Sequence, residues 1–109
     1  MPDPNELDDQ MFSAPLGEHR ALAVLRMLAR FPGYTGNTLV IGSCLEYVGL
    51  PTSQTVIRST LAFLEGQGLL TLKMAEDLIV VELSAAGLDA AKGLTYVAGV
   101  LRPPPQCPY

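Results

Sequence analysis

Apolar residues follow helical spacing in the first part of the chain and near-alternation further on. The segment Glu18–Phe31 (EHRALAVLRMLARF) consists of good helix formers and is stopped by Pro32. Apolar residues fill nine of its fourteen positions, which is more than one core-facing stripe requires. This pattern predicts a helix that is either central to the core or covered by a partner.

Two further helices are predicted on either side of a tight turn. The first spans Thr38–Val48 and is capped by Asn37 or Thr38. After the turn Leu50-Pro51, the second spans Ser53–Gln67 and is capped by Thr52 or Ser53. Three apolar residues share its inward face: Ile57, Leu61 and Leu64.

Near-alternation follows the second of these helices. Leu69–Met74 and Leu78–Leu83 are predicted to be strands, joined by the turn Ala75-Glu76-Asp77. Ser84 then caps a short helix over Ala85–Lys92. The fold class expected from this order is mainly α with a small β-hairpin.

The two ends of the chain lack this periodicity. Residues 1–17 carry four acidic residues and no basic one, which is typical of a disordered acidic arm. Residues 94–109 (LTYVAGVLRPPPQCPY) are apolar and then rich in proline, and they predict an extended tail. The folded domain is therefore expected over residues 18–93.

The net charge of −4 is unusual for a nucleic-acid-binding protein. The acidic arm accounts for it, because residues 18–109 hold seven acidic and seven basic residues. No apolar run approaches the ~20 residues that cross a bilayer, and the acidic start is the opposite of a signal peptide. A cytoplasmic location without membrane contact is expected.

No set of side chains indicates catalysis. His19 is the only histidine, and Cys44 and Cys107 lack the pairwise spacing of a metal site. The chain contains no phosphate-binding glycine loop and no supported Ser-His-Asp order. We expect a protein that is not an enzyme and holds neither metal nor cofactor.

The segment VIRSTLAFLEGQGLLTL resembles the winged-helix pattern L-x-x-L-x-x-x-G-L-[IVL]. The segment LSAAGLDAAKG resembles the pattern L-[ST]-x-x-G, which follows the second wing strand in MarR- and ArsR-like regulators. Together these resemblances cover Glu18 to Gly93. The whole chain, with its acidic arm and GVLRPP ending, is also similar to the small ArsR-type proteins of Mu-like prophages. The fold implied is a winged helix-turn-helix.

By this resemblance, the helix over Ser53–Gln67 would enter the major groove of DNA. The candidate DNA-binding residues are Ser53, Gln54, Thr55, Arg58, Ser59 and, on the wing, Lys73. Arg26 and Arg30 are further candidates for phosphate contacts. A solvated helix face is the alternative interpretation.

Two features depart from the family pattern. The wing tip presents Glu76 and Asp77, where wings that contact phosphate usually present Arg or Lys. The cysteine pairs of ArsR-type metal sensors are absent, because Cys44 is alone in its helix. A response to metal is therefore not implied.

We expect a transcriptional regulator that binds double-stranded DNA as a homodimer. The dimer interface is expected to form from the surplus apolar surface of Glu18–Phe31 and from the tail. A winged helix used for protein contacts in a phage or nucleoprotein assembly is the alternative. A tail that folds back over the first helix within one chain would cover the same apolar surface without a second copy.

Overall fold

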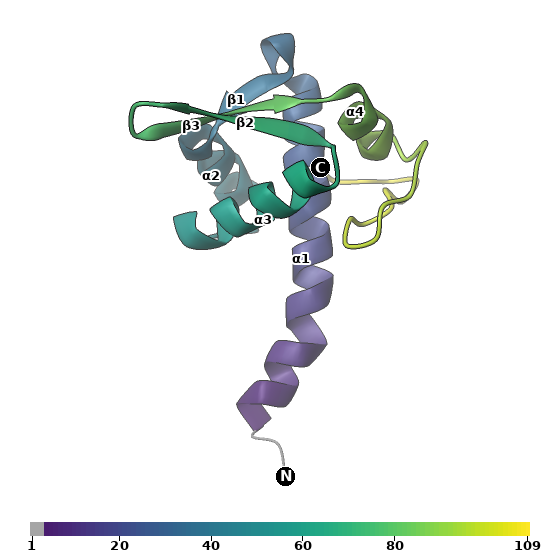
Figure 1. Cartoon of the computed structure of the whole chain (residues 1–109). Coiled ribbons are helices and arrows are strands. Elements are labelled where there is room, and N and C mark those ends of the chain that lie inside the picture. Colours follow the sequence, from purple (N-terminus) through teal and green to yellow (C-terminus); the bar gives the residue numbers. More distant parts are fainter. Residues whose placement is uncertain (1–3) are drawn as a thin grey trace.

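The computed structural model describes residues 4–109 of the chain. Its elements in chain order are α1 (Pro4–Arg30), the short 3-10 helix η1 (Pro32–Tyr34), β1 (Thr35–Asn37), α2 (Thr38–Tyr47), α3 (Gln54–Gly66), β2 (Leu70–Ala75), β3 (Leu78–Leu83) and α4 (Ala85–Ala91). Figure 1 shows the long helix α1 running through the centre, with the other helices and a small sheet gathered around its C-terminal half.

The predicted helices and strands agree closely with these bounds. The predicted strand Leu78–Leu83 is β3 without any shift, and the other boundaries after α1 move by at most one residue. The expected caps are also confirmed at all three helices. The Asn37 side chain accepts hydrogen bonds from the backbone nitrogens of Leu39 and Val40, at 3.0 and 2.9 Å. Ser53 and Ser84 cap α3 and α4 in the same way.

The sheet has one strand more than the predicted hairpin. Its order is β1-β3-β2, with β3 antiparallel to both neighbours. The added strand β1 contains only Thr35, Gly36 and Asn37, and Gly36 lies opposite Val81. A Cβ atom at Gly36 would stand 2.9 Å from the Phe31 ring, so glycine allows the strand to approach the end of α1.

The core forms where α1 meets the other helices and β3. Large side chains of α1, α2, α3 and the sheet are almost completely buried there: Leu22, Leu25, Leu28, Ile41, Leu45, Ile57, Leu61, Leu64, Leu70 and Val81. The predicted inward face of α3 is confirmed by this burial. The opposite face of the same helix is consequently left to solvent.

The N-terminal segment differs from the prediction. Residues 4–17 belong to the helix α1, where the sequence predicted a disordered arm, and residues 1–3 lie outside the described part of the chain. The physical reason lies in the segment itself. Pro4 is the first helical residue, where proline is tolerated because its missing N–H has no helical partner, and neither proline nor glycine follows until Pro15.

The tail, residues 94–109, contains no helix or strand and returns to α1 (Figure 1). The Leu101 backbone nitrogen donates to the Glu18 oxygen at 3.1 Å, and Val100 is buried with 5% of its surface exposed. The tail covers part of α1 within one chain, whereas Leu94 and Tyr96 of the tail itself stay exposed, at 70% and 69%.

Candidate nucleic-acid interface

The outward face of α3 is formed by short polar side chains around one arginine. Thr55, Arg58 and Ser59 are exposed, whereas Ile57 and Leu61 on the other side of the helix are buried. The Ser59 hydroxyl donates to the backbone oxygen of Thr55, at 3.2 Å, within the helix itself. Among residues 14–109, the Arg58 guanidinium makes no hydrogen bond or ion pair with another group. Its donors are therefore available to a ligand.

Two other predicted contacts serve the protein's own structure. The Ser53 hydroxyl caps α3 by accepting from the Val56 nitrogen at 3.2 Å. The Gln54 side-chain nitrogen donates to the Thr38 backbone oxygen at 3.3 Å, and so ties the start of α3 to the start of α2. This bond uses one of the two N–H groups of the Gln54 amide and holds the side chain against α2.

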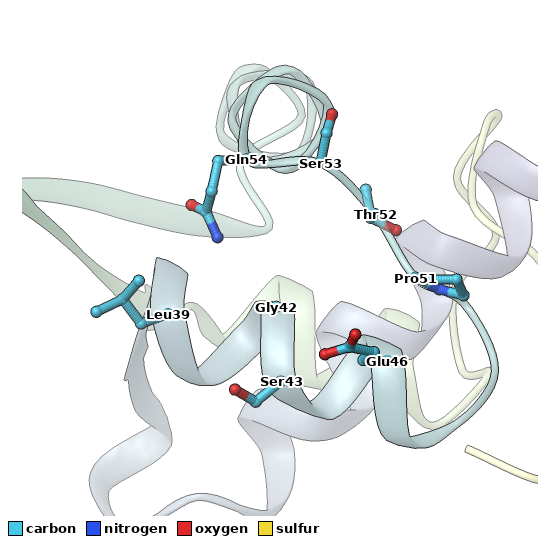
Figure 2. Close-up of a pocket in the computed structure, with 8 residues that line it drawn as sticks. All are labelled: Leu39, Gly42, Ser43, Glu46, Pro51, Thr52, Ser53 and Gln54. Atoms are coloured by element: carbon cyan, nitrogen blue, oxygen red, sulfur yellow. The ribbon is translucent and has the colours of Figure 1, made fainter.

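A polar hollow separates the first turn of α3 from α2 (Figure 2). Its volume is about 500 Å³, and Gln54 reaches across it toward α2. Gly42 makes this approach possible, because a Cβ atom there would stand 3.1 Å from the Gln54 nitrogen. The full lining is Leu39, Gly42, Ser43, Glu46, Pro51, Thr52, Ser53 and Gln54.

The turn between α2 and α3 is anchored to α1. The Arg20 side chain donates to the Thr52 hydroxyl oxygen at 3.1 Å, and that hydroxyl donates to the Leu50 backbone oxygen at 2.7 Å. Arg20 thus fixes where α3 begins relative to α1. Sequence reasoning did not assign this role, because the two residues lie 32 positions apart.

A second hollow, of about 420 Å³, brings α3 together with the hairpin turn. Arg58 lines it opposite the turn residues Glu76 and Asp77, and Thr38 and Leu39 at the start of α2 complete it. Sequence reasoning did not include Thr38 and Leu39 in the site, although the cap at Asn37 indicated where α2 begins. The two carboxylates lower the local potential around Arg58 and would repel a phosphate.

The remaining predicted contacts lie elsewhere. Lys73 is exposed on β2, where it pairs with Val80, and does not line either hollow. Arg26 donates to the backbone oxygens of Ala91 and Tyr109, and Arg30 also donates to the Tyr109 oxygen. In Figure 1, α4 and the tail lie on the opposite side of the molecule from the hairpin tip and the start of α3. The two arginines are therefore separate from the α3 surface.

Within the described part of the chain, no three His, Cys, Asp or Glu side chains are grouped to hold a metal ion. None of its helices combines the length and apolar character needed to span a membrane.

Comparison with known proteins identifies two similar chains. One is "Uncharacterized protein gp26" of Escherichia phage Mu, 34% identical over 96 residues, which cover 88% of this chain and 99% of the phage protein. The other is an "Uncharacterized protein" of Haemophilus influenzae, 35% identical over 66 residues, which cover 61% of this chain and 64% of that protein. No family model and no solved structure matches.

Proposed function

This chain belongs to the family of gp26 of Escherichia phage Mu, and we propose that it binds double-stranded DNA through a winged helix-turn-helix. The element order supports this proposal: α2 and α3 follow one another across a short turn, and the hairpin β2–β3 comes directly after α3. In such a domain α3 is the recognition helix, and the hairpin is the wing.

The observation that carries the proposal is the free outward face of α3. Ile57, Leu61 and Leu64 bury one side of the helix in the core. Core packing therefore does not determine which residues form the polar side. That side presents the Arg58 guanidinium, whose planar pair of donors matches the two acceptors of guanine in the major groove. Thr55 and Ser59 flank it with hydroxyl groups that suit a phosphate or a base edge.

The charges around this face set the expected strength of binding. Arg58 and Lys73 are the cations that the recognition helix and the wing contribute, and Glu76 and Asp77 oppose them. If these two cations neutralise about two phosphates, a plot of log affinity against log salt concentration should have a slope of roughly −2. Weak, salt-sensitive binding is expected, measurable only at low ionic strength.

The test is an electrophoretic mobility shift at low salt with a pool of mixed duplexes and with DNA from upstream of the gene itself. The proposal predicts that the wild-type chain retards DNA and that Arg58→Ala binds its preferred duplex at least about fivefold more weakly. Arg102→Ala is the matched control, because it removes the same charge from an exposed position in the tail. Lack of retardation at low salt, or equal binding by the two variants, would refute DNA binding through α3.

A second candidate, a winged helix that binds another protein, is favoured by the apolar side chains around the same surface. Leu39 beside Arg58 is 63% exposed, and Met74 on the wing is 65% exposed. Methionine is enriched in protein interfaces, and the acidic tip suits a basic partner better than it suits DNA. Failure of the shift assay would leave this candidate as the preferred function.

A further inference from the structure

Val56 is an exposed apolar side chain in the first turn of α3. It leaves 38% of its surface to solvent, whereas its neighbour Ile57 is 1% exposed and packs into the core. The Val56 backbone nitrogen donates to the Ser53 hydroxyl at 3.2 Å, so this valine lies at the capped end of the helix. Valine stabilises an exposed helix position less well than alanine does, because its branched Cβ restricts the side chain. Helix formation therefore does not favour valine here, and the core does not enclose it.

Val56 and Arg58 lie on opposite flanks of the exposed face of α3. Two residues along an α-helix correspond to a rotation of about 200°, so the two side chains point to different sides of the helix. Arg58 lines the hollow that α3 shares with the hairpin turn, and Val56 does not. Thr55 and Ser59, which are short and exposed, lie between the two flanks. Because the middle of this face is low, both flanks can contact one surface at the same time.

The chemistry of the major groove provides a partner for an exposed valine. The C5 methyl group of thymine is the apolar group that base edges present there. Helix-turn-helix domains contact base edges with the N-terminal residues of the recognition helix, and Val56 belongs to this part of α3. Contact between the valine and the methyl group removes apolar surface of both from water. The branched side chain has one preferred rotamer in a helix, so it loses little conformational entropy on binding.

We propose that Val56 is a specificity-determining residue that recognises the C5 methyl group of a thymine, on the flank of α3 opposite the guanine that Arg58 contacts. The inference rests on the proposed binding of DNA through α3. It defines the class of duplex that the chain prefers, namely one in which a thymine and a guanine both lie along the first turns of α3. A cytosine in place of this thymine offers no methyl group to Val56.

Replacement of thymine by deoxyuridine tests this contact, because it removes only the C5 methyl group and keeps the base pair. A pool of mixed duplexes first yields a duplex that the wild-type chain retards in a low-salt shift assay. That duplex is then synthesised with deoxyuridine at each thymine in turn. We expect one position at which the replacement weakens binding about three- to fivefold, the effect of losing the burial of one methyl group.

Three variants assign this preference for thymine over deoxyuridine to a side chain. Val56→Ala should bind both duplexes equally well, and it should keep the fold, because alanine favours the helix. Val40→Ala is the matched control, since Val40 on α2 is 41% exposed, and it should leave the preference unchanged. Thr55→Ser removes the other methyl group of this turn, keeps the hydroxyl and should also leave the preference unchanged. Far-UV circular dichroism checks that each variant is folded.

The preference for thymine separates this inference from DNA binding itself. If Thr55→Ser loses the preference and Val56→Ala keeps it, Thr55 makes the contact and the proposal for Val56 is overturned. Retardation that is equal for thymine and deoxyuridine at every position also overturns it. DNA binding through α3 would then still stand if Arg58→Ala weakens the complex. Lack of retardation at low salt would refute both proposals.

Discussion

Gly87 lies directly against the backbone oxygen of Leu69: a Cβ atom at residue 87 would stand 1.9 Å from that oxygen and 2.6 Å from the Leu83 side chain. Ser84 holds the same junction, because its backbone nitrogen donates to the Leu69 oxygen at 3.1 Å and its hydroxyl donates to the Gly68 oxygen at 2.7 Å. The glycine of the L-S-A-A-G sequence is thus required by the close approach of α4 to the chain entering β2.

Gly87→Ala should therefore destabilise the fold. The added methyl group meets backbone rather than a flexible side chain, so we expect a loss near the upper end of the ~1–3 kcal/mol usual for overpacking. Gly66→Ala is the matched control, because Gly66 is the last residue of α3 and has no atom within 4 Å of a Cβ position. The control should be stabilised by roughly 0.5–1 kcal/mol. Urea denaturation measures both, and equal stabilities would contradict the contact.

Removing the charges of the hairpin turn should strengthen DNA binding if α3 binds DNA. Glu76 and Asp77 line the same hollow as Arg58, and their neutral forms would no longer repel phosphate. We expect each charge removed to strengthen DNA binding about two- to fivefold in low-salt shift assays of the double variant Glu76→Gln/Asp77→Asn. This gain should shrink as salt is added. Glu82→Gln, an exposed residue of β3 that does not line the hollow, is the control. An equal gain in the control would point to net charge instead.

The tail should keep the protein monomeric by covering α1. We expect the full chain to sediment near its mass of 11.6 kDa at micromolar concentration, and a chain lacking residues 94–109 to self-associate through the exposed α1 surface. Val100→Asp should have the same effect as the deletion, since Val100 is buried. Tyr96→Asp should not, because Tyr96 is 69% exposed. A full chain that sediments as a dimer would restore the homodimer predicted from the sequence.

Attachment of the tail should weaken in strong alkali. The Tyr109 hydroxyl lies 2.9 Å from the His19 Nδ1, with the two rings edge to face. Burial raises the pKa of the Tyr109 phenol above its usual 10.0, and the neighbouring Cys107 raises it further. Because this pKa is higher in the folded state, its contribution to stability is complete below pH 10 and is lost as the pH rises through the raised value.

Hydrogen exchange of the tail amides between about pH 9 and 11 measures this effect, after correction for intrinsic exchange. Protection should fall above pH 10 in the wild type and in Tyr96→Phe. It should stay constant in Tyr109→Phe, which lacks the ionising group. If the protection of the tail amides falls equally in Tyr109→Phe and in the wild type, ionisation of another group releases the tail.

Local signals explain why the sequence was sufficient for most of the elements. The apolar spacing of α3, its cap at Ser53 and the glycines after it depend on residues that are close neighbours in the chain. The same holds for the hairpin, whose two strands are joined by a short turn. The exposed face of α3, with Thr55, Arg58 and Ser59, followed from the burial of the opposite face. These features are set by periodicity and capping, which act within a few residues.

Other features were decided only by contacts between distant residues. Three residues, Thr-Gly-Asn, are too few to show alternation, and β1 is a strand because it pairs with β3, with Thr35 opposite Glu82. Gln54 is a candidate base contact, and the fold brings its side-chain nitrogen to the Thr38 backbone oxygen. Arg26 and Arg30 stay predicted phosphate contacts, and the fold brings the Tyr109 oxygen to both of them from 83 and 79 residues away. A donor's partner depends on which acceptor the folded chain brings within about 3 Å, and only the tertiary structure specifies that position.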